Sequence, residues 1–219
     1  SKFAPTHYPP DLSLEPTHRD IRLTVDPKTQ TAHGTVAVTV QANRPGVTTL
    51  ELDAVDFQDV KVESDQPVDF SYDGKKISIR WEKPFQSYES RAATIAYRVV
   101  QPITGLFFSS PTEMYPDAGT WAATDHETER ARYWLPCIDH PNVRTTLHFE
   151  LTSDADYTIL ANGELTSETV DNGMKTAIWD LDFPCPSYLC CFALGDFTTF
   201  DDGEFNGLPV AYFASKEHP

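Results

Sequence analysis

Ile21-Arg22-Leu23-Thr24-Val25 and Thr35-Val36-Ala37-Val38-Thr39-Val40 are the stretches that decide the fold class. In both, branched aliphatic side chains alternate with smaller or polar ones, which places the two sets on opposite faces of an extended strand. Further strands are predicted where the alternation recurs or where β-branched and aromatic residues are enriched. These segments are residues 50–52, 77–81, 91–99, 145–151, 157–161, 175–181, 188–193 and 208–213.

Short turn sequences separate these segments, among them Asp26-Pro27, Asp73-Gly74, Asn162-Gly163 and Asp202-Gly203. Strands spaced in this way favour an all-β fold of antiparallel sheets, arranged as a sandwich or as saddle-like sheets. The sequence predicts no amphipathic helix, and no Gly/Ser-rich linker divides the chain. We therefore expect residues 1–219 to form a single β domain.

Acidic residues outnumber basic ones along the whole chain: 33 Asp and Glu against 17 Lys and Arg give a formal net charge of −16. Because an acidic surface repels phosphates, nucleic acid and anionic lipid are disfavoured as partners. No apolar stretch approaches the roughly 18 residues of a membrane-spanning helix. The first residues contain no apolar signal core, so we expect a cytoplasmic protein that does not bind membranes.

The segment His126-Glu127-Thr128-Glu129-Arg130 begins like the zinc-hydrolase motif HExxH but ends in arginine. That motif needs two histidines one helical turn apart to bind one metal ion, and Arg130 cannot supply the second imidazole. The four cysteines lack the paired CxxC spacing of a zinc site. Motifs for acyl transfer, nucleotide hydrolysis and dinucleotide binding are missing from the sequence. The residues thus predict no catalytic side chain, no metal ligand and no cofactor in this chain.

A longer motif runs from Thr124 to Pro141 and contains Glu127, Ala131-Arg132, Leu135-Pro136-Cys137 and Asp139. In this motif the sequence resembles the aminopeptidase N family of zinc peptidases, to which leukotriene hydrolase also belongs. Asp125 stands where the family most often has Gln. Two flanking segments are similar to strands of the family's N-terminal domain, namely Gly105-Leu106-Phe107-Phe108 and Gly195-Asp196-Phe197.

The resemblance covers nearly the whole chain, but only the first domain of such an enzyme. It implies an N-terminal domain without hydrolytic activity that packs on its own catalytic domain. That catalytic domain, with its GxMEN loop, its HExxH motif and its zinc ion, would lie outside residues 1–219. Whether the longer protein is an active aminopeptidase is left open by this resemblance. The resemblance also implies that Glu127 binds the free amino terminus of a peptide substrate. It further implies that Asp125 helps to shape the pocket for the first substrate side chain.

The local sequence offers other roles for the same residues. Thr124 and Glu127 have the spacing of a capping box, in which the glutamate only returns a hydrogen bond to the backbone. Arg132 and Asp139 are expected to form an ion pair that organises the turn at Pro136. Cys137 is expected to be a small core residue, because nothing in the sequence pairs its thiol with a base.

Two further functions are compatible with the sequence. A large subunit of transcription initiation complexes contains an aminopeptidase-like domain without peptidase activity, so the chain could be a scaffold that binds proteins. It could also be a free-standing β-sandwich module that binds a ligand through exposed aromatic residues. The candidates for such a stacking platform are Trp81, Trp121, Trp134 and Trp179.

Overall fold

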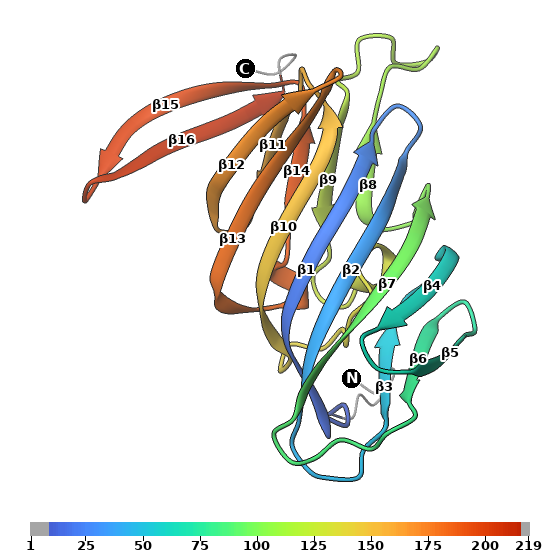
Figure 1. Cartoon of the computed structure of the whole chain (residues 1–219). Helices are drawn as coiled ribbons and strands as arrows, with labels where there is room; N and C mark the ends of the chain where they lie inside the picture. The colour runs from blue at the N-terminus through green and yellow to red at the C-terminus, as the bar shows by residue number, and fades with distance from the viewer. Residues whose placement is uncertain (1–8, 216–219) are drawn as a thin grey trace, which may run out of the picture.

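The computed structural model describes residues 9–215 and is built almost entirely from strands (Figure 1). Its largest element is a seven-stranded sheet with the order β12-β13-β10-β1-β2-β7-β4. In this order the strands are Glu164–Asp171, Met174–Pro186, Arg144–Asp154, Leu14–Asp26, Thr31–Ala42, Ser90–Val100 and Gln58–Ser64.

Three smaller sheets accompany it. A four-stranded sheet, with the order β11-β14-β9-β8, lies behind the seven-stranded sheet in Figure 1 and consists of Thr158–Ala161, Phe192–Gly195, Trp121–Asp125 and Gly105–Ser109. A three-stranded sheet has the order β3-β6-β5, which are Thr49–Asp53, Lys76–Trp81 and Val68–Tyr72. The hairpin of β15 (Phe197–Phe205) and β16 (Leu208–Ser215) projects away from the body of the molecule.

The only helical segments in the part of the chain that the structure describes are two 3-10 turns, η1 (Ala131–Tyr133) and η2 (Ser187–Leu189). Among the described residues no helix has the length and apolar character needed to cross a bilayer. The expected all-β fold of several antiparallel sheets is therefore confirmed.

The pairing of β1 with β10 departs from the antiparallel prediction. These two strands are parallel, with Ile21 opposite Phe149, whereas the other paired strands of the described sheets are antiparallel. Parallel neighbours cannot be joined by a tight turn, and here β2 to β9 and the whole motif segment come between them in the chain. Within this long connection β2, β7 and β4 remain in the seven-stranded sheet, whereas β3, β5 and β6 form the three-stranded sheet and β8 and β9 join the four-stranded one.

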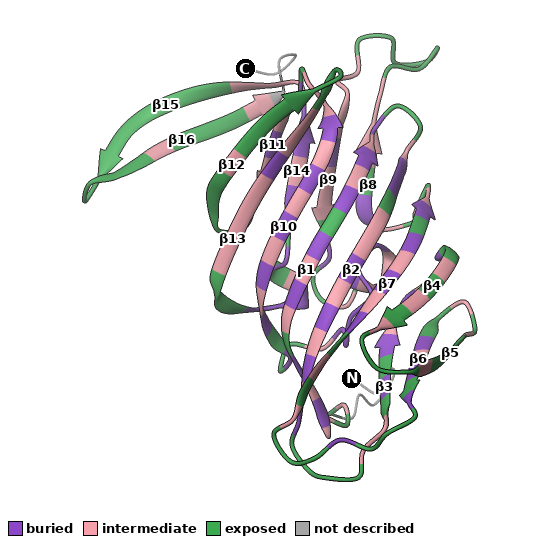
Figure 2. Ribbon diagram, in the orientation of Figure 1, coloured by how far each residue is buried: buried purple, intermediate pink, exposed green. Residues whose placement is uncertain are grey.

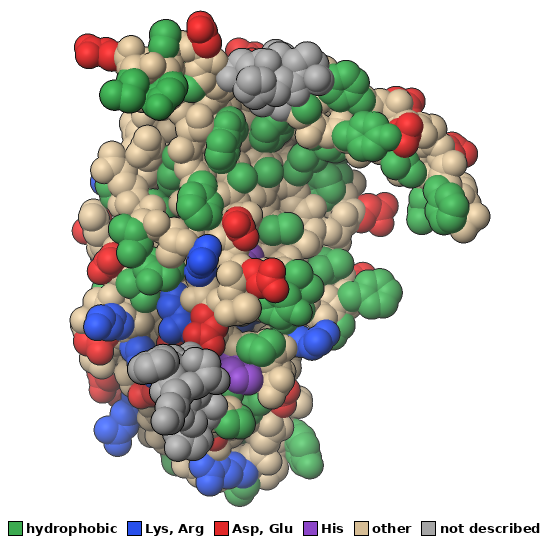
Figure 3. All heavy atoms as spheres, turned by 180° about the vertical axis from the view of Figure 1, so that it is seen from behind, with side chains coloured by type: hydrophobic (Ala, Val, Ile, Leu, Met, Phe, Trp, Pro, Cys, Tyr) green, Lys and Arg blue, Asp and Glu red, His purple; other side chains and the backbone are tan. Residues whose placement is uncertain are grey.

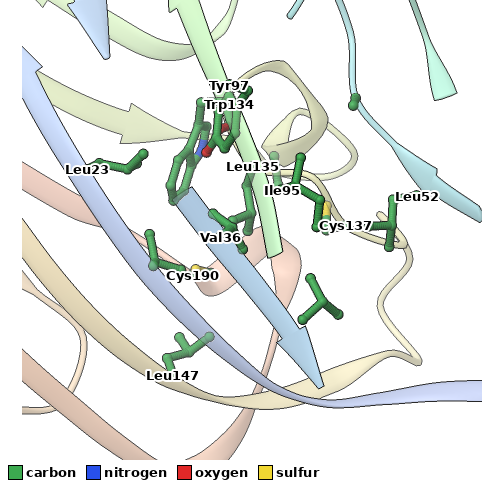
Figure 4. Close-up of a cluster of buried hydrophobic side chains, with 14 of the residues drawn as sticks. Leu23, Val36, Leu52, Ile95, Tyr97, Trp134, Leu135, Cys137, Leu147 and Cys190 are labelled. Atoms are coloured by element: carbon green, nitrogen blue, oxygen red, sulfur yellow. The ribbon is translucent and has the colours of Figure 1, made fainter. Parts of the chain in front are cut away.

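The hydrophobic core fills the space between the seven-stranded sheet and the elements behind it. Buried residues alternate with mostly half-buried ones along β1 and β2, as the period of two predicts (Figure 2). Figure 4 shows side chains of these strands meeting residues of the motif segment, with Leu23 and Val36 close to Trp134 and Leu135. Trp134 and Leu135 are completely buried. The motif is therefore inserted into the core, which fixes the position of the residues just before it.

The predicted strand over residues 188–193 is wrong in its first half. Residues 187–189 form η2 instead, and β14 begins only at Phe192. The N–H group of Cys190 donates to the carbonyl oxygen of Ser187, which closes a turn and prevents strand pairing there. A series of apolar residues alone does not distinguish a strand from a tightly packed turn.

Candidate functional site

The residues of interest lie between the end of β9 and η1. β9 ends at Asp125, and the chain then turns so that the N–H group of Arg130 donates to the carbonyl oxygen of His126 over 3.1 Å. From there η1 leads into the buried part of the motif. This turn leaves the side chains of Asp125 and Glu127 exposed, while His126 between them is buried.

A shallow pocket of about 310 Å³ opens beside this turn. One wall comes from the end of β9 and the residues after it, and the other from η2 and the residue before β14. Two carboxylates therefore lie beside apolar side chains from a segment about sixty residues later in the chain. The lining residues are Thr124, Asp125, His126, Glu127, Tyr188, Leu189 and Cys191.

The hydroxyl group of Thr124 joins the two walls of the pocket. It accepts a hydrogen bond from the N–H group of Phe192 over 3.0 Å and donates one to the carbonyl oxygen of the same residue over 3.2 Å. η1 begins only at Ala131, and its N-cap residue is Arg130, without a side-chain capping bond. The capping-box alternative for Thr124 and Glu127 therefore does not describe this structure.

Asp139 and Arg132 form an ion pair, with 3.1 Å between Oδ2 of the aspartate and Nε of the arginine. The side chain of Asp139 is fully buried and also accepts a hydrogen bond from the hydroxyl group of Ser187 over 2.7 Å. Arg132 reaches Asp53 in β3 as well. Burial acts to lower the pKa of the Arg132 guanidinium, but the carboxylates of Asp53 and Asp139 raise it. This network holds η1, η2 and β3 together directly beneath the pocket.

Cys137 belongs to the core and follows the buried turn residue Pro136. Its peptide group pairs with that of Asp53 as an isolated antiparallel bridge, with N···O distances of 2.7 and 3.1 Å. Burial raises the pKa of the Cys137 thiol well above its usual value. The thiol is therefore protonated near neutral pH, and its surroundings are those of a packing residue and not of a nucleophile.

His126 is the residue that the sequence analysis overlooked, because it was considered only as part of a failed metal motif. Its ring is 2% exposed and stacks on Trp134, with 6.0 Å between the ring centroids. Nδ1 lies 3.0 Å from the carbonyl oxygen of Tyr188 in η2. Burial lowers the pKa of His126. No local pattern could reveal this contact, since the pairing of β9 with β14 brings the two segments together.

The family resemblance implies zinc in a catalytic domain outside this chain, and the described residues do not fit a zinc site of their own. No group of three His, Cys, Asp or Glu side chains among residues 9–215 could hold a metal ion. The pocket contains one histidine, and its Nδ1 is already hydrogen-bonded to Tyr188. No chemical step through zinc is therefore derived from this chain.

The tryptophans do not form an exposed platform. Trp81 and Trp134 are completely buried, and Trp121 and Trp179 are half-buried. Because stacking on a sugar ring needs an accessible aromatic face, the described structure does not favour the free-standing binding module.

Comparisons with known proteins agree with the motif. Glutamyl aminopeptidase from Rattus norvegicus is 36% identical over 93 residues, which are 42% of this chain and 10% of that protein. Alanine/arginine aminopeptidase from Saccharomyces cerevisiae is 20% identical over 224 residues, covering 98% of this chain and 25% of the relative. The chain thus spans a quarter or less of the length of these curated relatives.

Solved structures with the same fold are zinc metallopeptidases. An M1 zinc metallopeptidase from Deinococcus radiodurans is 24% identical, with a TM-score of 0.73, and the match covers 91% of this chain and 46% of that one. A two-domain M1 zinc metallopeptidase bound to L-tryptophan has a TM-score of 0.74 at 22% identity, with 91% and 47% covered. The profile of the Peptidase M1 N-terminal domain matches residues 15–189. The chain belongs to the peptidase M1 N-terminal domain family.

Proposed function

We propose that this chain is the non-catalytic N-terminal domain of a zinc aminopeptidase, and that it presents Glu127 to the free amino terminus of a peptide substrate. The observation that carries the proposal is the position of Glu127. Its side chain is exposed at a pocket, while the turn that bears it is attached to the core through Arg132 and Asp139. An accessible carboxylate on a rigid support is what recognition of a substrate ammonium group requires.

The chemistry of such a site is simple. A protonated amino terminus donates charge-assisted hydrogen bonds to a carboxylate, and the second carboxylate at Asp125 adds to the negative potential of the pocket. In open solvent this attraction is weak, because water screens the charges. It becomes stronger once a second domain covers the pocket and excludes water. Zinc, water activation and bond cleavage would then be supplied by the catalytic domain.

The outward face of the four-stranded sheet is suited to contact that domain. One row of directly opposed residues on this face consists of apolar side chains, namely Leu160, Ala193, Ala123 and Phe107. Asp125 lies at the end of the same sheet. Seen from behind the seven-stranded sheet, hydrophobic side chains gather over the upper half of the molecule, above acidic side chains near its centre (Figure 3).

The projecting hairpin adds further apolar surface. Phe205 and Leu208, at its tip, are 70% and 68% exposed. Exposed apolar surface of this kind marks contact sites in soluble proteins. The M1 structures similar to this chain are about twice its length, which leaves room for a partner domain. We therefore infer that this surface packs on the catalytic domain.

The proposal is tested by Glu127→Ala in a protein that joins this domain to its catalytic domain, assayed with an aminoacyl amide substrate. The variant is expected to raise KM and to lower kcat/KM about 10- to 150-fold, which corresponds to roughly 1.5–3 kcal/mol for a hydrogen bond to a charged group. Glu164→Ala, at an exposed glutamate on the edge strand β12, is the matched control and should leave both constants unchanged. Unchanged kinetics in Glu127→Ala would refute the role of Glu127.

A further inference from the structure

His126 carries a buried nitrogen without a partner. Its ring lines the pocket between Asp125 and Glu127. Nδ1 lies 3.0 Å from the carbonyl oxygen of Tyr188, but Nε2 is buried and has no hydrogen-bond partner within the described part of the chain. Leaving a buried polar atom unpaired costs stability, so such an atom calls for an explanation.

The protonation state of the ring follows from its contacts. A carbonyl oxygen can only accept, so Nδ1 carries the hydrogen atom that is donated to Tyr188. Burial is the largest influence on the ring and lowers its pKa. The carbonyl groups of Tyr188 and Cys190 and the carboxylates of Asp139 and Asp125 raise the pKa by less, so that it stays below its usual value. The ring is therefore neutral near pH 7, and Nε2 is a hydrogen-bond acceptor.

Two donors next to His126 in the pocket are already engaged. The hydroxyl group of Thr124 donates to the carbonyl oxygen of Phe192. The N–H group of Cys191 donates to Oδ1 of Asn162 over 2.6 Å. The face of the imidazole is packed on Trp134, which in turn packs edge-on against Phe192. Neither of these two donors is available to Nε2, and a molecule that enters the pocket can supply one.

We propose that Nε2 of His126 accepts a hydrogen bond from the ammonium group held at Glu127, and that His126 is thus a third binding residue of the amine site. This inference rests on the proposed function of Glu127. An ammonium group has three N–H donors, and the residues that line the pocket carry two carboxylates and the unpartnered nitrogen of His126. A neutral acceptor adds a hydrogen bond without adding to the repulsion between the carboxylates.

The arrangement has a consequence for pH dependence. Protonation of His126 removes the acceptor and places a positive charge beside the bound cation. The charged and titratable residues that line the pocket or act on the pKa of the ring are Asp125, Glu127, Asp139, Tyr188, Cys190 and Cys191. Amine binding is therefore expected to weaken as the pH falls through the pKa of His126.

The test is nitrogen-15 NMR of the histidine rings in this chain, with L-alaninamide as the probe and N-acetyl-L-alaninamide as the uncharged control. At about pH 6.5 the α-amino group of the probe is protonated. We expect His126 to show the tautomer with hydrogen on Nδ1, and its Nε2 resonance to shift upon addition of L-alaninamide but not of the acetylated control. The amide resonance of Glu127 should shift in the same titration.

The outcomes separate the two proposals. A shift at Glu127 without a shift at Nε2 of His126, or a tautomer with hydrogen on Nε2, would overturn the role of His126 and leave that of Glu127 intact. No shift at either residue would count against both. Two variants provide a second measurement. His126→Asn keeps a donor near the place of Nδ1 and loses Nε2, whereas His126→Gln keeps a polar atom near the place of Nε2.

We expect His126→Asn to bind L-alaninamide at least about 10-fold more weakly than the unmodified chain, the lower end of the range for a hydrogen bond to a charged group, and His126→Gln to recover part of the loss. The asparagine variant should also lose the weakening of binding at acidic pH that histidine protonation causes. Equal affinity of the asparagine variant and the unmodified chain at neutral pH would refute the inference.

Discussion

Asp139 supports the pocket although it does not line it. Its buried carboxylate receives hydrogen bonds from Arg132 in η1 and Ser187 in η2. η2 forms one wall of the pocket, and η1 follows the turn that forms the other. A buried carboxylate is stable in its charged form only while such donors surround it. The geometry of Glu127 thus depends on residues that a search for exposed functional side chains would miss.

Replacing this carboxylate should be costly. Asp139→Ala is expected to lower the free energy of unfolding by about 3 kcal/mol, because the buried hydroxyl group of Ser187 and the guanidinium of Arg132 lose their acceptor. Urea unfolding followed by circular dichroism measures the change. Asp20→Ala is the control, since Asp20 pairs with Arg22 at the surface and should cost at most about 1 kcal/mol. Similar losses in both variants would contradict the buried network.

The two histidines with lowered pKa predict how stability depends on pH. Burial is the main cause for both His18 and His126, whose usual pKa is 6.5. As the pH falls below that value the unfolded chain binds protons before the folded one does, so the free energy of unfolding should decrease. Chemical unfolding at several pH values measures the slope. His126→Asn should reduce it, whereas His33→Asn, at an exposed position, should not.

Among the elements, β8 packs closely against the motif segment, and a single glycine makes this contact possible. Gly105 has a φ of +80°, and a Cβ atom at this position would overlap the carbonyl oxygen of Arg130 and come within 3.3 Å of the Cβ atom of Tyr133. The strand can therefore approach the turn before η1 only because residue 105 has no side chain. This explains why the strand preceding the motif begins with glycine.

A matched pair of glycine variants separates backbone strain from this close approach. Gly74 has a similar φ of +87° but open space around it. Gly74→Ala should cost about 1–2 kcal/mol from strain alone, whereas Gly105→Ala should cost clearly more and should shift the amide resonances of the residues around Glu127. Thermal unfolding and NMR spectra of the two variants provide the measurement. Equal costs would mean that Gly105 matters only for its conformation.

At the scale of the whole molecule, stability is distributed unevenly. β1 is hydrogen-bonded on both sides, to β2 and to β10, and its inward side chains lie in the core. The hairpin of β15 and β16 pairs only with itself and exposes most of its side chains. The domain thus has a rigid sheet behind the pocket and a projecting hairpin that has few contacts with the rest of the domain.

Hydrogen exchange should reproduce this distribution. Amide groups in the centre of β1 are expected to exchange at least about 100-fold more slowly than those of β15, because the hairpin can open without disrupting the core. Exchange followed by mass spectrometry resolves the two segments. If a catalytic domain covers the hairpin, its amide groups should become protected in the longer protein while those of β1 change little. Protection of the hairpin equal to that of β1 in this chain would contradict the prediction.

Some strands could not be found from the sequence, and β12 is the clearest example. It is the edge strand of the seven-stranded sheet, and nearly all its side chains are exposed. Its strand conformation comes from backbone hydrogen bonds to β13, which do not require an alternating pattern. The parallel pairing of β1 with β10 was equally hidden, because the alternation of side chains is the same for parallel and antiparallel neighbours.

The sequence by itself determined the strands with one buried face and the identity of the motif, since both are written in residues close together in the chain. It also pointed to Glu127, Arg132 and Asp139 as residues of interest. Only the tertiary structure decided that η2 forms the second wall of the pocket and that His126 is buried within it. The physical reason is that these contacts join residues about sixty positions apart, and they exist only after β14 has paired with β9.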